Sequence, residues 1–145
     1  MGSTSSLYKD PSATDENALK TVLDPSDDAA YVATNGVAHM PTQAELNELT
    51  ANTTSAFTTV NGVSGIKLTS KKEGYTDKYI FIPASGDAND GSVNGRGSYG
   101  RVWCSRLYAG NSLSAWYLNF RRGILYVDDN VRYSGFSVRG VVSKN

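Results

Sequence analysis

The chain has 145 residues and no formal net charge, with 39% hydrophobic and 19% charged residues, a composition typical of an ordinary soluble domain with one core. No run of residues approaches the roughly 18 apolar residues that cross a membrane, so we expect no membrane insertion. Cys104 is the one cysteine and His39 the one histidine, which excludes an intramolecular disulfide and the common zinc sites built from cysteine and histidine.

The start of the chain predicts a polar leader over residues 1–23, followed by a domain over 24–145. Serine, threonine and aspartate dominate the leader, and Pro11 and Pro25 each stand between an aspartate and a serine, a pattern typical of turns. We expect the leader to be only partly ordered, because it has few apolar residues to bury.

The first strong signal for regular structure is a helix of about ten residues after Thr42. Thr42 and Glu45 have the three-residue spacing of a capping box, in which each side chain bonds the backbone N–H of the other residue. Leu46 and Leu49 then supply one apolar face, which predicts that the helix packs on a sheet.

After this helix the pattern changes to short strands separated by turns. A glycine-rich stretch at 85–100 interrupts them and predicts a long loop, a length that is usually functional in a compact domain. The predicted strands are Phe57–Val60, Ile66–Thr69, Tyr79–Ile82, Arg101–Arg106, Ser114–Phe120, Gly123–Val127 and Phe136–Val141. We therefore predict an α+β fold, with a short helix packed on a mostly antiparallel, twisted sheet.

The two halves of the chain differ in composition. Residues 1–50 carry a charge of −6 and residues 94–145 a charge of +6. From Tyr79 to Ser143 there is no Lys, Glu, Gln or Met, and nine of the fifteen aromatic residues follow Asn94. Strands disfavour Lys and Glu, which explains part of this bias. The Arg, Tyr, Trp, Asn and Asp that remain are the residue types that build recognition surfaces.

Alternation along the predicted strands indicates which side chains face outward. Trp116, Leu118 and Phe120 share one side, which leaves Tyr117 and Asn119 on the other. The candidate ligand-binding residues, which we expect to point away from Trp103, Trp116, Leu118 and Phe120, are Arg101, Arg106, Tyr117, Asn119, Arg121, Tyr126, Asp128, Asn130, Arg132 and Tyr133. An alternative is that these side chains form cross-strand pairs that stabilise an exposed sheet.

The sequence contains no legible nucleophile with a base, pair of carboxylates or metal site, so we expect no catalytic residues, no metal and no cofactor. We interpret His39 as a structural hydrogen-bonding group near the helix start, and Cys104 as a small, mostly buried side chain. Residues 87–91 suggest a calcium loop but lack the regular spacing of oxygen ligands, which favours an ordinary turn. The arginines and tyrosines of the last third suggest nucleic acid, but overall neutrality argues against it.

Several segments carry a resemblance to a known family: His39–Leu46, Phe57–Gly65, Phe81–Ala84, Gly97–Gly100 with Trp103–Ser105, and Gly135–Arg139. Together they resemble the Fibrobacter succinogenes major paralogous domain family, over roughly Asp24 to Val142. The resemblance implies a C-type-lectin-like fold. It also implies a ligand-binding domain like the variable proteins of diversity-generating retroelements in bacteria and phages. The expected partner is a protein or glycan receptor on a cell surface, and the expected location is a virion or bacterial surface.

The chain departs from the family pattern at a few positions. Ala38 and His39 stand where the family usually has Trp-Arg, and Gly140 stands where it usually has Pro. Around Trp103 and Ser105, the segment 101–106 replaces a run of Tyr and Ser, as variation laid over a constant pattern would. Retroelement variation at adenines in Asn-type codons cannot yield Lys, Glu, Gln or Met, which fits their absence. The alternative is an undiversified adhesin or structural domain of a Bacteroides-type surface protein.

Overall fold

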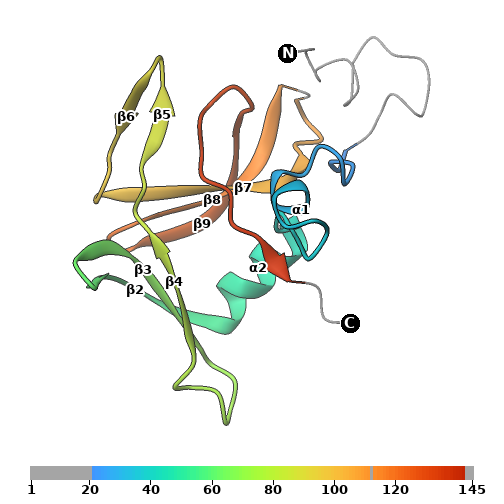
Figure 1. The fold of residues 1–145 in the computed structure, drawn as a ribbon. Coiled ribbons are helices and arrows are strands. Elements are labelled where there is room, and N and C mark those ends of the chain that lie inside the picture. The colour runs from blue at the N-terminus through green and yellow to red at the C-terminus, as the bar shows by residue number, and fades with distance from the viewer. Residues whose placement is uncertain (1–20, 112, 143–145) are drawn as a thin grey trace.

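The computed structural model describes residues 21–111 and 113–142, so most of the predicted leader lies outside the described residues. The described part holds two short helices and ten strands in four small antiparallel sheets (Figure 1). The fold class is therefore α+β with antiparallel strands, as predicted. The elements are α1 Ala29–Ala33, β1 Ala38–His39, α2 Gln43–Asn52, β2 Thr53–Val60, β3 Val63–Ser70, β4 Tyr79–Pro83, β5 Asp87–Asn89, β6 Ser92–Asn94, β7 Tyr99–Leu107, β8 Ser114–Arg121, β9 Ile124–Val131 and β10 Val141–Val142. Among the described residues, none of the helices has the length and apolar character needed to span a membrane.

The predicted helix is confirmed as α2, and its capping box is complete. The Thr42 backbone N–H donates to Glu45 Oε2 at 2.8 Å, and the Glu45 N–H donates to Thr42 Oγ1 at 3.2 Å. Two of the otherwise unpaired N–H groups at the helix start are thereby satisfied. Leu46 is buried and directs α2 against the sheet, as predicted.

The second helix, α1, was not predicted. The carboxylate of Asp28 caps it by accepting from the backbone N–H groups of Ala30 and Tyr31, each at 2.9 Å. Its other oxygen accepts from the Met40 N–H at 2.8 Å, which ties this short helix to the segment before α2. A helix of one and a half turns depends on such tertiary bonds, because its own propensity is too weak to form it.

The main core lies between α2 and one face of the three-stranded sheet β7–β8–β9. Val102 of β7 is opposite Leu118 of β8, and Phe120 is opposite Gly100. These side chains pack with Leu46 of α2 and with apolar residues of the β2–β3–β4 sheet. A Cβ at Gly100 would lie 2.1 Å from the Phe120 ring, so only glycine lets this ring lie flat against β7.

Several predicted boundaries need correction: β2 begins at Thr53 and β3 at Val63, four and three residues before the predicted starts. The glycine-rich stretch 85–100 contains the hairpin β5–β6 and is not a plain loop. Strand β9 continues to Val131, beyond the predicted end. The predicted strand Phe136–Val141 is mostly irregular: Ser137 forms a single parallel bridge with Val102, and only Val141–Val142 pairs with β1. The segment crosses from one sheet to another, so it cannot stay in one ladder (Figure 1).

Candidate binding site

The face of the β7–β8–β9 sheet opposite α2, here called the outer face, carries most of the candidate residues. Residues directly opposite each other on paired strands share a face. The register places Arg101 opposite Asn119, and Asn119 opposite Tyr126. The outer-face residues are Tyr99, Arg101, Trp103, Tyr117, Asn119, Arg121, Tyr126, Asp128 and Asn130.

Part of the predicted surface is wrong, because Tyr117 and Asn119 are buried, with exposed fractions of 4% and 9%. Phe136 covers this part of the outer face. Its ring centroid lies 4.3 Å from that of Trp103 and 4.9 Å from that of Tyr117. Trp103 therefore lies on the same side as Tyr117, not on the opposite side as expected. Alternation indicates the side of a strand, but it does not reveal a segment that folds back over that side.

Arg101 is engaged within the fold. It forms an ion pair with Asp87 of β5, and its guanidinium lies 5.0 Å from the Tyr99 ring centroid and 5.2 Å from that of Phe136. The pair attaches the β5–β6 hairpin to the sheet. Next to it, Asn119 Nδ2 donates to Tyr126 Oη at 2.6 Å. Arg101 and Asn119 thus hold neighbouring strands together, which is the alternative that the sequence left open.

The other candidates differ in exposure. Arg121, Asp128 and Tyr126 are exposed, and Tyr133 is the most open at 84%, while Asn130 and Arg132 are half-buried. Arg106 is exposed too, but it lies beyond the β-bulge of β7 beside Val22, away from the rest. The accessible candidates are therefore Arg121, Tyr126, Asp128, Asn130, Arg132 and Tyr133, which run from the β8–β9 turn to the loop after β9.

The β5–β6 hairpin adds residues that sequence reasoning missed. Ala88 and Gly135 exchange two backbone hydrogen bonds of 2.7 and 2.9 Å, which join the hairpin to the loop after β9. Between the hairpin and this loop lies a hollow of about 630 Å³, lined by Tyr133 and by Asn89 and Asp90 of the hairpin. The turn pattern at residues 87–91 indicated the hairpin tip, but it did not indicate that the loop carrying Tyr133 lies beside it.

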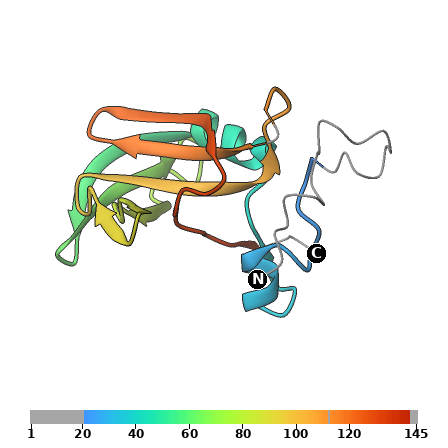
Figure 2. The same cartoon turned by 90° about the horizontal axis from the view of Figure 1, so that it is seen from above.

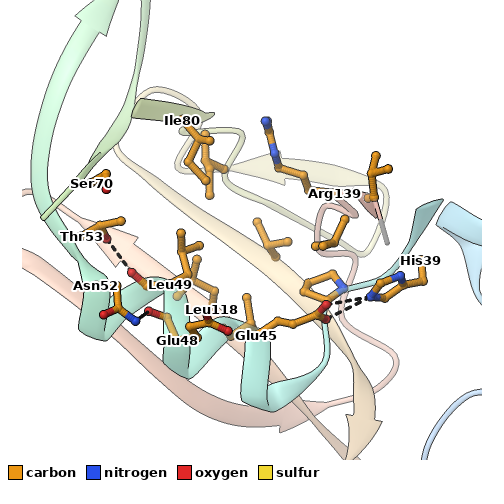
Figure 3. A pocket seen from close by; sticks show the side chains of 17 residues that line it. His39, Glu45, Glu48, Leu49, Asn52, Thr53, Ser70, Ile80, Leu118 and Arg139 are labelled. Atoms are coloured by element: carbon orange, nitrogen blue, oxygen red, sulfur yellow. Dashed lines mark hydrogen bonds and ion pairs between the residues drawn. The ribbon is translucent and has the colours of Figure 1, made fainter. Parts of the chain in front are cut away.

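A second hollow, of about 800 Å³, lies between α2, β4 and β10 (Figure 3). Leu46, Ile82 and Leu118 contribute to its apolar lining, and Glu45 and Arg139 are among its charged lining residues. Its walls come from six separate parts of the chain, so no local pattern predicted it. The shape suits an apolar group, and the described residues do not indicate which one.

No match is found to a family model, a curated protein or a solved structure. Within residues 21–111 and 113–142, no three His, Cys, Asp or Glu side chains gather as metal ligands would. Cys104 is buried as predicted, and burial raises the pKa of its thiol to about 11, so it stays protonated at neutral pH.

His39 bonds the helix cap, which confirms its structural interpretation. Its Nε2 lies 3.0 Å from both carboxylate oxygens of Glu45, which also accepts from the Thr42 backbone and hydroxyl (Figure 3). Burial alone would raise the pKa of Glu45, but the hydrogen bonds from Thr42 and His39 together outweigh it and hold the pKa below its usual value.

We expect the Glu45→Gln variant to show a shallower loss of stability in acid than the wild type. A lowered folded-state pKa means that ionised Glu45 stabilises the fold. This contribution is complete above the ordinary glutamate pKa of about 4.3 and is lost as the pH falls through the lower folded value. Urea unfolding between neutral pH and pH 3 measures the difference. Glu48→Gln, an exposed change on the same helix, is the control, and equal slopes for the two variants would contradict the assignment.

Proposed function

We propose that this domain is a non-enzymatic receptor-recognition module of C-type-lectin-like fold, which binds a protein or glycan on a cell surface through the accessible part of its outer face. The observation that carries the proposal is that the two faces of the sheet differ in exposure. In β8 and β9 one side chain set packs against α2, while Arg121, Tyr126 and Asp128 on the other side are exposed. Exposed side chains on a rigid sheet can vary without disturbing the core.

The place of the β1–β10 pairing supports the same proposal. Strands β1 and β10 pair close to the two ends of the described residues, beside α1 and α2. The outer face, the β5–β6 hairpin and the loop carrying Tyr133 lie away from that pairing (Figure 1). A ligand can therefore reach the hairpin and the Tyr133 loop without meeting the β1–β10 pairing, whereas residues 21–23 pack against the far end of β7 and beside Trp103.

The proposed contact residues are fewer than the sequence suggested. Tyr117 and Asn119 are assigned to structure because they are buried, and Arg101 because it is paired with Asp87. The remaining contacts are Arg121, Tyr126, Asp128, Asn130, Arg132 and Tyr133, joined by Asn89 and Asp90 of the hairpin. Tyrosine and asparagine are frequent in binding loops, which combine rigid rings with adaptable hydrogen bonds.

Binding of the fluorescently labelled full chain to a panel of intact gut bacteria, measured by flow cytometry, tests the proposal. We expect the double variant Tyr126→Ser/Tyr133→Ser to lose at least about tenfold in apparent affinity, since exposed tyrosines are frequent binding hot spots. Tyr75→Ser is the matched control, because Tyr75 is an exposed tyrosine on the remote β3–β4 hairpin. Unchanged binding by the double variant, with unchanged melting temperatures, would contradict the proposal.

The runner-up function, an undiversified adhesin or structural surface domain, differs from the proposal at the level of the gene. A diversified variable protein requires a near-repeat of the segment encoding the outer face, with a reverse transcriptase gene nearby. Sequencing the locus and finding neither favours the adhesin. Binding through Tyr126 and Tyr133 would then still stand, but without retroelement variation.

A further inference from the structure

Three turns meet at one end of the molecule, here called the three-turn end. They are the β2–β3 turn at Asn61–Gly62, the turn 95–98 before β7, and the β8–β9 turn at Arg122–Gly123. Tyr99 pairs with Arg121, so the second and third turns are neighbours. The two views show the β2–β3 turn at the same end (Figures 1 and 2).

The three-turn end carries unbalanced positive charge. Arg96, Arg121 and Arg122 are exposed, and none forms an ion pair with a described acidic side chain. No Asp or Glu occurs in residues 49–72 or 91–127, which include all three turns. Arg101, the next arginine along β7, is neutralised by Asp87. The end therefore has three guanidinium charges and no acid of its own.

Two of the three charges, those of Arg121 and Arg122, lie on different sides of the sheet. Arg121 continues the outer-face alternation of β8 beside Tyr99, whereas the Arg122 guanidinium lies 5.5 Å from the ring centroid of Phe57 in β2. One small anion cannot contact both groups. The same turns also carry uncharged polar residues, among them Asn61 and Ser98, which donate and accept hydrogen bonds.

These features favour a carboxylated polysaccharide over nucleic acid. Guanidinium forks pair well with carboxylates, and amide and hydroxyl side chains match sugar hydroxyls. Duplex DNA carries one charge per about 1.7 Å, which calls for a dense row of cations. The three-turn end offers three exposed arginines, fewer than such a row requires.

We propose that the three-turn end binds an acidic glycan whose carboxylates are spaced along a chain of sugar rings, with Arg96, Arg121 and Arg122 each taking one carboxylate. This inference rests on the proposed receptor-recognition function, for which it names the class of ligand. It extends the contact surface beyond the outer face to Arg96 and Arg122, which lie in the turn 95–98 and the β8–β9 turn.

Binding of the full chain to immobilised polygalacturonate and hyaluronate, measured by biolayer interferometry, tests the inference. Methyl-esterified polygalacturonate keeps the sugar and removes the charge, so we expect it to bind at least about tenfold more weakly. The variant Arg96→Ser/Arg121→Ser/Arg122→Ser should lose about tenfold or more on polygalacturonate. Lys71→Ser/Lys72→Ser/Lys78→Ser, which removes the same charge from the exposed β3–β4 hairpin, should lose less than about twofold.

Several results would overturn the inference. These are no binding to either acidic polymer, equal binding of the methyl ester, equal losses in the two triple variants, or stronger binding to single-stranded DNA or poly-glutamate than to polygalacturonate. Melting temperatures of both triple variants confirm that each remains folded. Failure here leaves receptor recognition intact if the Tyr126 and Tyr133 changes still abolish cell binding, so the two proposals fail separately.

Discussion

The Phe120→Ala variant is expected to lose about 3–5 kcal/mol in its free energy of unfolding. Phe120 is fully buried, with an exposed fraction of 0%, and it packs in the core between α2 and the β-sheets. Its removal forfeits the burial of a large ring and leaves a cavity beside Gly100, which has no side chain to fill it. Urea unfolding at neutral pH measures the loss.

Two further variants sharpen this first prediction. Phe57→Ala removes the same ring from a half-buried position and should cost clearly less. Gly100→Ala tests the contact from the other side, because its new methyl group meets the Phe120 ring and should also destabilise the fold. A loss below about 1.5 kcal/mol for Phe120→Ala would place this ring outside the core and contradict the register of β7 and β8.

The second large effect is expected for Tyr117→Ser, with a loss of about 3 kcal/mol or more. Tyr117 packs against Phe136 and, edge to face at 6.0 Å between centroids, against Trp103. Burial also raises the pKa of its hydroxyl, as expected for a ring withdrawn from water. Tyr133→Ser, on the exposed loop, should change stability by no more than about 0.5 kcal/mol.

A double-mutant cycle with Phe136→Ala isolates the cause of this second effect. If Phe136 covers Tyr117, the two changes should be less than additive, with a coupling of about 0.5–1.5 kcal/mol for the ring pair. Additive losses, or equal losses in Tyr117→Ser and Tyr133→Ser, would contradict the cover. The first outcome would show that Phe136 does not support Tyr117, and the second that Tyr117 is no more buried than Tyr133.

The features that could be predicted from the sequence are those determined by near neighbours. Helix α2 was found because Thr42 and Glu45 cap it three residues apart. The inward side of β8 was found because Leu118 and Phe120 alternate with polar residues. In both cases the deciding physics acts over a few residues, so the linear pattern contains it.

The features that the sequence did not reveal depend on distant partners. Helix α1 needs the bond from Met40 to Asp28, and the burial of Tyr117 needs Phe136, nineteen residues along the chain. The two hollows and the three-turn end each collect residues from several separate elements. The family resemblance supplied expectations of fold and ligand class, which remain predictions for the experiments above.

The crossing segment around Ser137 has a consequence for how the chain folds. Ser137 bonds the β7 backbone and shares a 2.7 Å hydroxyl contact with Ser85, while Val142 pairs with Ala38, about 100 residues earlier. Contacts between such distant residues form slowly, because closing a long loop costs entropy before the contact is made. During synthesis this segment also emerges after the strands that it covers. Until it docks, Trp103 and Tyr117 face water as an aromatic patch, so the nascent domain passes through a state prone to self-association.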